Sequence, residues 1–389
     1  MKFYHIILAE QHLRKFIKAS FMKILYSCLS KSWGGMEMLT ITSIKQLRKR
    51  NIEVTLLCSS ESRIHTEANS LGIIIHPLNS KNLKLPLNIL KLRGILRNSN
   101  FDVIHTHASN DLWLLVPSLK LSKKNIPLFL TKHVGSYIIK KDNLHKIIYR
   151  RVTKVFAISK VISENLIETC PLDESKVTLL HNGIDVEKFK TNIELIKSGR
   201  LKQEVSEDEI LIGMMGRFSP GKGHEEFLQT AKELNKKHDN LKFIIIGEAS
   251  RGEDKYAKKI KKSAITNNIK NIIFTGYLSD VRETLSAMDI FIFPSHAEAF
   301  GLALAEAMAM ELPTVCSDSD GVLDIAVDGE TSFLFENKNA SDLTKKMELL
   351  INSKEKRISF GKNGRERIVN NFNLETQTDK VIEIYDSYK

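Results

Sequence analysis

The sequence predicts an α/β protein made of two domains, each built on a parallel sheet. Three observations lead to this prediction. The chain has 389 residues, a length more typical of two domains than of one. Strand-like apolar runs alternate with helix-like runs, as they do in parallel-sheet folds. A polar stretch at about residues 188–208 interrupts this alternation, which then begins again.

Apolar and β-branched stretches mark the strands of the first domain, at residues 22–29, 52–58, 101–107, 128–130, 154–157 and 177–180. A helix is expected at residues 36–50, after a glycine-containing turn. The second domain repeats the pattern, with strands expected at residues 210–215, 242–246, 271–274, 289–293, 314–316 and 332–335. We place the first domain at residues 1–190 and the second at residues 191–373. Residues 1–21 are expected to be an extension, a disordered or amphipathic tail.

The composition is that of an ordinary globular protein, with 42% hydrophobic and 27% charged residues. The cysteines are far apart and form no metal-binding or redox spacing, which argues against a zinc site or a disulfide framework: Cys28, Cys58, Cys170 and Cys316. No apolar run reaches the length of a membrane-spanning helix. The N-terminus lacks the long apolar run and the cleavage site of a signal peptide. We therefore expect a cytoplasmic protein.

Positive charge is concentrated in the first half of the chain. Residues 1–190 carry 30 Lys and Arg against 14 Asp and Glu, a net charge of +16, whereas the whole chain has +12. Such an excess favours an anionic partner for the first half, namely nucleic acid, anionic lipid or a phosphorylated glycolipid. The alternative is a lysine-rich surface that only keeps the protein in solution.

A glycine-rich loop with two cations follows the first strand of the second domain. It reads Gly216-Arg217-Phe218-Ser219-Pro220-Gly221-Lys222-Gly223 and precedes a helix-like run. Glycines allow the backbone to approach a ligand, and the N-terminus of a helix offers free N–H groups to an anion. Arg217 and Lys222 add charge suited to two phosphates. The loop matches neither the P-loop nor the GxGxxG pattern, which disfavours a P-loop nucleotidase and a standard dinucleotide-binding protein.

Two glutamates follow a later strand of the same domain. Glu298 lies in an expected loop, and Glu306 lies on a helix that begins near Gly301. Eight helical steps span about 12 Å, which is longer than the roughly 5–9.5 Å between the paired carboxylates of glycoside hydrolases. The spacing suits the two ends of one extended ligand, because a carboxylate accepts hydrogen bonds from vicinal hydroxyls. The alternative is a solvated pair, although the apolar neighbours of Glu306 make this weaker for Glu306.

The first domain offers weaker signals at the carboxyl ends of its strands. Gly34 and Gly35 form a turn through which backbone N–H groups could reach a ligand. His105 and His107 are two apart on one strand and face the same side, but the sequence offers no obvious third metal ligand. His133 follows the next strand and could contact sugar hydroxyls or a developing charge. For each histidine, a purely structural role is the alternative.

Together these motifs resemble the retaining glycosyltransferases of family 4, which have the GT-B fold. The segment from Glu298 to Glu306 resembles the E-x7-E motif of that family, and GRFSPGKG resembles its donor-phosphate loop. The strings HNGID at 181–185 and VFAISK at 155–160 are also similar. The resemblance runs from about residue 22 to the C-terminus. It implies two Rossmann-like domains that face each other across a cleft, with a last helix at 374–389 that returns to the first domain.

The resemblance also implies roles for individual residues. Arg217 and Lys222 would hold the diphosphate of a nucleotide-sugar donor, and Glu306 would bind its ribose. Glu298 and His133 would contact the donor sugar. The implied donor site comprises Gly34, Gly35, Arg217, Lys222, Glu298, Ala299, Phe300, Gly301, Leu302 and Glu306. The implied catalytic residues are His133, Arg217, Lys222 and Glu298. No metal and no cofactor is implied, since the two cations supply the charge that a metal would provide.

One segment departs from the family pattern. After the strand PTVC the family usually has Gly-Gly-Val-Pro-Glu, whereas this chain has Asp320-Gly321-Val322-Leu323-Asp324. The departure affects backbone contacts to the donor. Asp318-Ser319-Asp320 spells a D-x-D metal motif, but it lies outside the position that this motif takes in metal-dependent transferases, and we interpret it as a turn.

We therefore expect a retaining transfer of a sugar to a hydroxyl of a glycan or an anionic, lipid-linked acceptor in lipopolysaccharide, capsule or other cell-envelope polysaccharide synthesis. The acceptor would bind the first domain, where Trp33 could stack on a sugar or belong to the core, and where His105 and His107 are weaker candidates. The basic half fits attachment to the inner face of the plasma membrane. The alternatives are a nucleotide-sugar epimerase of similar shape and a non-catalytic scaffold. No nucleic-acid-binding signature is present.

Overall fold

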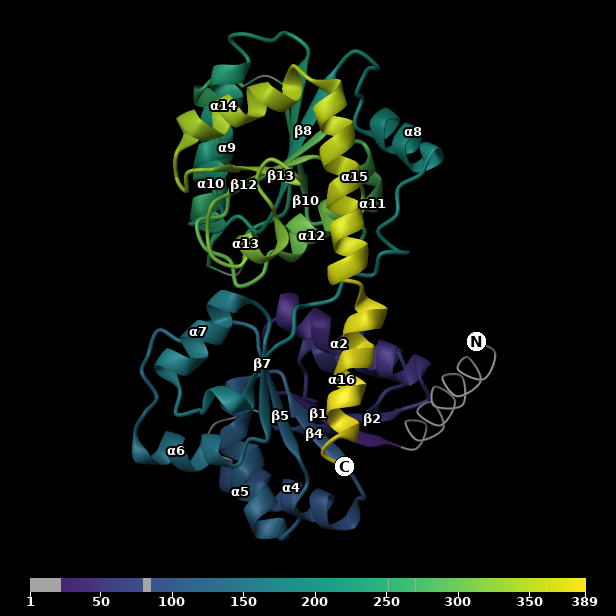
Figure 1. Cartoon of the computed structure of the whole chain (residues 1–389), viewed down its shortest axis with the longest axis vertical. Helices are drawn as coiled ribbons and strands as arrows, with labels where there is room; N and C mark the ends of the chain where they lie inside the picture. The colour runs from purple at the N-terminus through teal and green to yellow at the C-terminus, as the bar shows by residue number, and fades with distance from the viewer. Residues whose placement is uncertain (1–21, 80–84, 251, 270) are drawn as a thin grey trace, which may run out of the picture. The chain divides into compact units, whose positions relative to one another are not determined.

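The computed structural model describes residues 22–79, 85–250, 252–269 and 271–389 (Figure 1). The chain divides into two compact units, one ending at His181 and rejoined by Glu375–Lys389, the other formed by Asn182–Leu374. The expected extension at 1–21 lies outside the described residues. The division between the units precedes the polar stretch in which we expected the linker. Part of this stretch is helix α8 (Ile193–Lys202), which packs on α11 (Arg282–Ser286) inside the second unit.

The described part of the first unit contains a seven-stranded sheet, and every strand pair in it is parallel. The strand order is β3-β2-β1-β4-β5-β6-β7. The strands are β1 (Lys23–Cys28), β2 (Glu53–Ser59), β3 (Ile74–Leu78), β4 (Val103–Thr106), β5 (Leu128–Lys132), β6 (Lys154–Ala157) and β7 (Val177–Leu179). The strand β3 was not expected from the sequence. It lies at the sheet edge, where its Pro77 can be tolerated.

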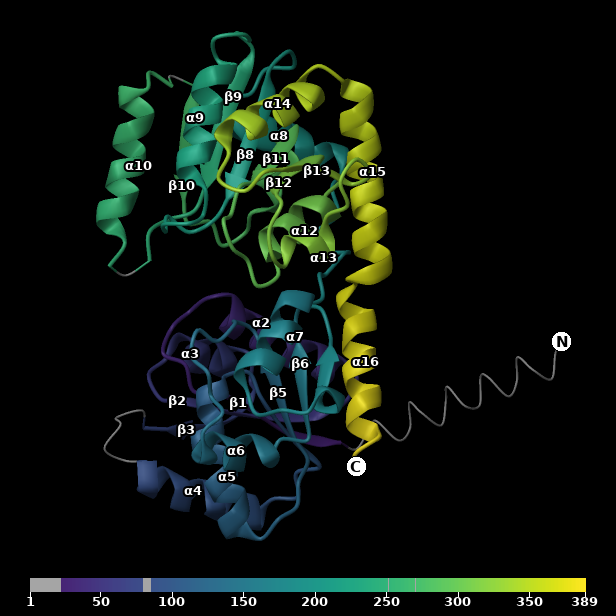
Figure 2. The same ribbon diagram turned by 60° about the vertical axis from the view of Figure 1, so that its left-hand side comes forward.

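Helices flank this sheet (Figure 2). They are α2 (Gly35–Lys49), α3 (Arg63–Ser70), α4 (Leu85–Asn98), α5 (Leu112–Ser122), α6 (Asn143–Arg150), α7 (Lys160–Thr169) and the C-terminal α16 (Leu374–Asp386). Several begin at a polar cap whose side chain accepts backbone N–H groups, as Ser62, Asp142 and Ser159 do. Two 3₁₀ turns, Ser109–Asp111 and Glu174–Lys176, complete the set.

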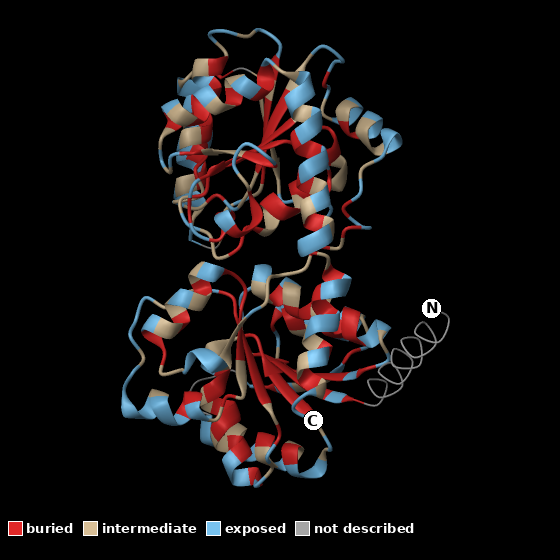
Figure 3. Cartoon of the chain, viewed as in Figure 1, coloured by how far each residue is buried: buried red, intermediate tan, exposed pale blue. Residues whose placement is uncertain are grey.

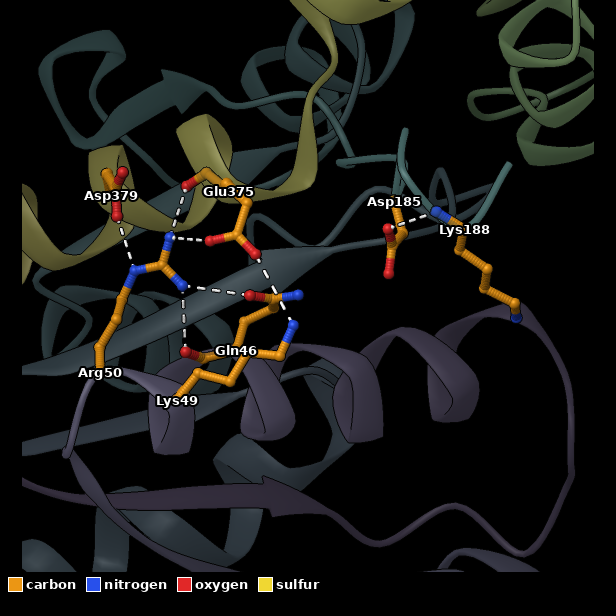
Figure 4. Close-up of polar contacts among 7 residues, drawn as sticks. All are labelled: Gln46, Lys49, Arg50, Asp185, Lys188, Glu375 and Asp379. Atoms are coloured by element: carbon orange, nitrogen blue, oxygen red, sulfur yellow. Dashed lines mark hydrogen bonds and ion pairs between the residues drawn. The ribbon is translucent and has the colours of Figure 1, made fainter. Parts of the chain in front are cut away.

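The C-terminal helix α16 is held on the first unit by polar contacts. The Tyr26 and Tyr385 hydroxyls are 3.2 Å apart in the buried interior. Arg50, at the end of α2, donates to carboxylates of Glu375 and Asp379, both at 2.7 Å (Figure 4). The side chain of Arg50 is only 13% exposed. A largely desolvated guanidinium with two carboxylate partners fixes α16 to α2 more firmly than a surface ion pair would.

The second unit repeats the architecture with a parallel six-stranded sheet of order β10-β9-β8-β11-β12-β13, within the described residues. Its strands are β8 (Ile210–Met215), β9 (Leu241–Ile246), β10 (Ile272–Gly276), β11 (Ile290–Phe293), β12 (Thr314–Ser317) and β13 (Ser332–Phe335). Its other helices are α9 (His224–Leu234), α10 (Asp254–Thr266), α12 (Leu302–Ala309), α13 (Val322–Ile325), α14 (Ala340–Ile351) and α15 (Lys354–Asn371).

Each unit has its own apolar core between sheet and helices (Figure 3). The central strands are buried almost throughout, whereas the edge strands β3, β7 and β10 are partly exposed and most helices show one buried and one exposed face. Both sheets reverse their strand order beside the first strand of the unit, at β1–β4 and at β8–β11. Ligands of doubly wound sheets bind at such reversal points. No helix of the described residues is long and apolar enough to cross a membrane.

Candidate active site

Three loops meet at the carboxyl ends of neighbouring strands in the second unit. The loop at 216–223 follows β8, the loop at 294–301 follows β11, and the loop at 318–321 follows β12. β8, β11 and β12 lie side by side in the sheet. Both sequence motifs of this unit therefore arrive at the point where the strand order reverses.

The first two loops are in direct contact. The backbone N–H of His296 donates to the carbonyl of Gly221 at 2.8 Å. Gly223 has a φ of +78°, and a Cβ on it would lie 2.1 Å from the carbonyl oxygen of Pro294. Only glycine fits this position, because both the left-handed backbone and the closeness of Pro294 exclude a side chain. The close approach places the start of α9 against the second loop.

Lys222 and Glu298 form an ion pair between these loops. Their side chains are 25% and 17% exposed. Ser295 also donates its hydroxyl to Glu298 Oε1, at 2.9 Å. The carboxylate is thus fixed by two partners, and the ammonium of Lys222 is held where the two loops join.

Arg217, the other cation of the first loop, is exposed and donates to the Ser250 hydroxyl at 3.1 Å. Ser219 donates its hydroxyl to the carboxylate of Glu253, which lies in the loop after β9. This hydrogen bond holds the pKa of Glu253 below its usual range. Ser250 and Glu253 follow β9, which pairs with β8. The Arg217 side chain therefore lies on the β9 side of its loop, whereas Lys222 lies on the β11 side.

The helix α12 begins at Gly301, whose φ is +99°. Ala299 and Phe300 precede it in the loop, Leu302 is its first residue, and Glu306 lies one turn further along. Glu306 is partly exposed, but the surrounding apolar residues bury it enough to raise the pKa of its carboxyl to about 7, with Lys188 opposing the shift. A carboxylate in such surroundings favours a hydrogen-bond donor or a cation as a partner.

The third loop closes against the second. The N–H of Gly321 donates to the carbonyl of Glu298 at 2.9 Å, and a Cβ on Gly321 would lie 2.5 Å from the carbonyl oxygen of Ala299. The glycine that the chain shares with the usual family pattern here is therefore required by packing. Asp318 and Asp320 are exposed, and Ser319 between them donates to the carbonyl of Ser295 at 3.3 Å. The D-x-D string forms part of the turn between β12 and α13.

In the first unit, three histidines form a buried stack at the ends of β4 and β5. The rings of His105 and His107 are 4.7 Å apart and nearly parallel, and those of His107 and His133 are 5.3 Å apart. Nδ1 of His107 lies 3.0 Å from Nε2 of His133. His105 contacts the hydroxyls of Thr131, at 2.8 Å, and of Tyr385. The C-terminal helix thus contributes directly to this cluster.

Burial keeps the three imidazoles neutral. It lowers the pKa of His105 to about 3 and that of His133 to about 4, and it lowers the pKa of His107 as well. The neighbouring histidines add to the effect on His105 and His107, and Lys132 adds to the effect on His133. Nε2 of His107 and Nδ1 of His133 are buried without a hydrogen-bond partner. Among the described residues no group of His, Cys, Asp and Glu side chains is arranged to hold a metal ion. The stack is therefore a neutral hydrogen-bonded cluster with free ring nitrogens.

The turn after β1 contains the glycine pair. Gly35 begins α2, and the N–H of Gly34 donates to the carboxylate of buried Glu37 at 2.9 Å. Trp33 packs on the core of the first unit with the Arg63 guanidinium 4.9 Å above its ring. One face of the indole is thus covered by protein, which gives Trp33 a packing role; its expected contact with an acceptor stays a prediction.

The structure brings together residues that the sequence presented separately: Lys222 with Glu298 in the second unit, and His107 with His133 in the first. Among the described residues, the Trp33 ring makes no ring contact with these histidines. Sequence reasoning missed Asp111, which is buried near β1 and accepts from Ser27 at 2.6 Å. Burial raises its pKa to about 6. An aspartate shortly after a buried strand was the only available signal.

Two family models match the chain in succession. Residues 33–188 match Glycosyltransferase Family 4, and residues 197–367 match Glycosyl transferases group 1. Together they cover most of the chain, one in each unit. The two models therefore identify a glycosyltransferase, and its two parallel-sheet units have the GT-B fold. The chain belongs to glycosyltransferase family 4, as its motifs predicted.

Curated relatives match nearly the full length. The capsular polysaccharide biosynthesis glycosyltransferase CapM of Staphylococcus aureus is 26% identical over 89% of this chain and 92% of its own. The UDP-Gal:alpha-D-GlcNAc-diphosphoundecaprenol alpha-1,3-galactosyltransferase of Escherichia coli is 24% identical over 94% and 96%. The chain is thus similar to enzymes of capsule and other polysaccharide synthesis throughout its length.

Solved structures share the fold. A glycosyltransferase from Rickettsia africae superposes with a TM-score of 0.86 at 23% identity, covering 94% of this chain and 98% of the other. Anabaena HepE in complex with UDP and glucose superposes with a TM-score of 0.81 at 20% identity, covering 94% and 100%. At this level of identity the likeness concerns the fold, which is the expected GT-B architecture.

Proposed function

We propose that this glycosyltransferase moves a sugar from a nucleoside-diphosphate sugar to a hydroxyl of a lipid-linked cell-envelope glycan, with retention at the anomeric carbon. The observation that carries the proposal is the Lys222–Glu298 ion pair, located where the glycine-rich loop meets the loop that opens α12. A cation beside a helix N-terminus suits a diphosphate, and a fixed carboxylate beside it suits the hydroxyls of the attached sugar.

Departure of the nucleoside diphosphate develops negative charge on its β-phosphate. In the proposed mechanism Lys222, Arg217 and the N-terminal amides of α9 stabilise that charge. Lys222 is paired with Glu298, so a phosphate that binds here either joins this ion pair or replaces Glu298 as the partner of the Lys222 ammonium. Glu298 then faces the donor sugar, and Glu306 accepts from the ribose hydroxyls. These roles need no metal, because the two cations supply the positive charge.

For the remaining donor contacts, we assign Gly34 and Gly35 to the donor phosphates and His133 to the donor sugar. Burial lowers the pKa of His133 to about 4, so its imidazole is neutral at physiological pH, and its Nδ1 has no hydrogen-bond partner among the described residues. A neutral imidazole can donate to or accept from a sugar hydroxyl without carrying a charge into the site. Nδ1 of His133 is therefore the atom that we assign to the hydroxyl.

A uridine nucleotide is the donor that we propose first. The E. coli relative is named for UDP-Gal, and HepE was crystallised with UDP and glucose. For the acceptor, the names of the E. coli relative and of a Campylobacter jejuni relative, 25% identical, both specify a diphosphoundecaprenol carrier. An anionic lipid-linked acceptor agrees with the net charge of +16 in residues 1–190. We accordingly propose peripheral attachment to the inner face of the plasma membrane, in capsule or lipopolysaccharide synthesis.

Release of UDP measured with and without a diphosphoundecaprenol-linked sugar tests the proposal. We expect UDP to accumulate from a UDP-sugar only when acceptor is present, and the product to keep the anomeric configuration of the donor, as read by NMR. UDP release without acceptor, accompanied by an altered free sugar, would instead indicate the epimerase alternative. Binding of UDP-sugar without consumption under either condition would indicate the scaffold.

A further inference from the structure

The segment between β5 and α7 exposes apolar side chains in a number unusual for a protein surface. Tyr137 is fully exposed, Ile138 and Ile139 are each 71% exposed, and Leu144 and Ile147 on α6 are 63% and 60% exposed. Isolated exposed apolar residues need no explanation, but a contiguous set marks an interaction site. Figure 3 shows α6 and the loop before it as a largely exposed edge of the first unit.

The loop is held in this conformation by defined contacts. Ser136 donates its N–H to Oδ1 of Asn165 at 2.6 Å, and Asn165 donates back to the Ser136 carbonyl at 3.0 Å. On the other side, the N–H of Lys140 donates to the carbonyl of Thr169 at 2.6 Å. Residues 137–139 form the tip between these two anchors on α7. These hydrogen bonds therefore hold the loop in a conformation that exposes residues 137–139.

The α6 helix extends the apolar surface. Leu144 and Ile147 are three residues apart and share one face of the helix. Ile148 and Tyr149 face the interior and are buried. Asp142 caps the helix by accepting from the N–H groups of Leu144 and His145. The helix is therefore firmly placed even though two large apolar side chains point away from the core.

Basic residues surround the apolar side chains. Lys140 and Lys141 follow the tip directly, and Lys146 and Arg150 lie on α6; Lys140 is half-buried and the other three are exposed. The one acidic residue in this segment, Asp142, is already bonded to His145 and to the helix N-terminus. Within the described part of the chain these four cations form no ion pair. Exposed apolar side chains surrounded by such cations are typical of a surface that enters an anionic bilayer, with tyrosine at the level of the headgroups.

We propose that this surface, formed by Tyr137, Ile138, Ile139, Lys140, Lys141, Leu144, Lys146, Ile147 and Arg150 and called here the tip surface, binds the anionic lipid bilayer. The inference deepens the proposed function and rests on it only in one respect, the lipid-linked acceptor. The tip begins four residues after His133, at the carboxyl end of β5. A bilayer held at the tip would therefore bring an embedded acceptor to the edge of the first unit that carries the histidine stack.

A second basic surface, on α10, is the other candidate for lipid binding among the described residues. Lys255, Lys258, Lys259 and Lys262 line one side of α10 in the second unit. Ile265, near the end of the same helix, is 78% exposed. α10 lacks a cluster of exposed aromatic and aliphatic side chains, so we expect its attraction to lipid to be electrostatic only and weak. Substitutions there are the matched control for charge.

Flotation of the full-length protein with vesicles tests the inference. Wild type should float with phosphatidylglycerol–phosphatidylethanolamine vesicles and not with phosphatidylcholine vesicles. Tyr137→Ser/Ile138→Ser/Ile139→Ser should weaken binding at least tenfold. Removing charge by Lys140→Gln/Lys141→Gln/Lys146→Gln/Arg150→Gln should weaken it by roughly fivefold per residue. The control variants, Ile193→Ser/Leu201→Ser/Ile265→Ser and Lys255→Gln/Lys258→Gln/Lys259→Gln/Lys262→Gln, should float like wild type.

Thermal unfolding with and without UDP separates lipid binding from folding and from the proposed function. Each variant should unfold near the wild-type temperature, and any stabilisation by UDP should be retained, because the tip surface lies outside the nucleotide loops. Failure of wild type to bind anionic vesicles, or wild-type binding by the tip variant, would overturn the inference. So would loss of binding confined to the α10 variant. Vesicle binding without any effect of UDP would leave the tip surface supported and would contradict the proposed donor.

Discussion

Lys222 and Glu298, 76 residues apart in the sequence, form an ion pair that joins the two principal loops of the second unit. Neither residue comes from a regular strand or helix, so their meeting depends on the contact between the loops. Gly221, Gly223 and Pro294 make that contact close. The cation that we assign to the donor phosphate and the carboxylate that we assign to the donor sugar are thus held together by the protein itself.

Lys222→Ala should lower turnover by roughly 10²–10³-fold, because a preorganised cation at the leaving phosphate is lost. Folding should change little, since a pair of partly exposed charges contributes on the order of 1 kcal/mol or less. Steady-state kinetics with thermal unfolding checks both. Lys236→Ala, which removes a surface pair with Glu233, is the control and should leave turnover unchanged. Turnover of Lys222→Ala within about twofold of wild type would contradict the role assigned to Lys222.

Gly223→Ala should destabilise the second unit by about 3 kcal/mol or more. The new methyl group is overpacked, and alanine is strained in the left-handed backbone conformation of this position. The clash with the carbonyl of Pro294 can be relieved only by separating the loops. Gly216→Ala is the matched control in the same motif. A Cβ there meets nothing within 4 Å, so its effect should stay below about 1 kcal/mol. Denaturant unfolding followed by circular dichroism measures both, and equal effects would contradict the loop packing described.

Glu306→Gln should stabilise the protein at pH 8 but not at pH 5. The folded pKa of Glu306, about 7, lies above the ordinary value, so the folded state retains a proton that the unfolded state releases between these values. The stability that protonated Glu306 contributes is therefore complete below its ordinary pKa and is lost as the pH rises through about 7. The neutral amide removes this loss, a gain of at most about 3 kcal/mol at pH 8.

Calorimetric unfolding at both pH values checks the Glu306 prediction. The same variant should bind nucleotide more weakly, because an amide is a poorer acceptor for ribose hydroxyls than a carboxylate. Stability and binding would then change in opposite directions, as expected of a functional group placed in an unfavourable environment. A variant that is less stable than wild type at pH 8 would show that Glu306 has a stabilising partner instead.

Acid should destabilise the first unit more than the second, because the first unit has three buried histidines with lowered pKa values and the second has His224. The buried His105, His107 and His133 have lowered pKa values. Below about pH 6.5 these histidines therefore bind protons in the unfolded chain but stay neutral in the folded unit. Stability present above pH 6.5 is then lost as the pH falls, by about 2 kcal/mol per histidine at pH 5. Both tryptophans, Trp33 and Trp113, lie in this unit, so their fluorescence reports its unfolding.

The control for the acid effect is His107→Gln, which should lower stability at pH 7 but reduce the loss between pH 7 and pH 5. The amide can replace one hydrogen bond to His133 and does not titrate. Tryptophan fluorescence melts at the two pH values give the comparison. An unfolding temperature of wild type that is equal or higher at pH 5 would contradict a neutral buried stack.

Hydrophobic patterning predicted the fold well, because parallel strands buried on both faces leave long apolar runs. It failed at β3, a short edge strand whose faces are half-exposed and whose Pro77 is typical of a turn. It also treated part of 188–208 as linker, although α8 packs through Gly199, where a Cβ would clash with the backbone of Glu283. Such a contact depends on a distant segment and leaves no local signal.

The site was predictable only in part for the same reason. Glycine and charge spacing identified the loops, and the alternation of a strand placed His105 and His107 on one face. The pairing of Lys222 with Glu298 and of His107 with His133 arises from strands that become neighbours only in the folded sheet. Ser295, which donates to Glu298, and buried Asp111 carried no pattern that distinguished them from ordinary polar residues.

Calorimetric titration with UDP, GDP and ADP, each with and without EDTA, tests the central claim most directly. We predict that one nucleoside diphosphate binds and that EDTA does not change its affinity. We also predict that Lys222→Ala and Glu306→Ala weaken its binding by about tenfold or more, the loss expected for one charged hydrogen bond. Binding that requires a metal, or that both variants leave unchanged, would contradict a metal-independent donor site formed by the loops after β8 and β11.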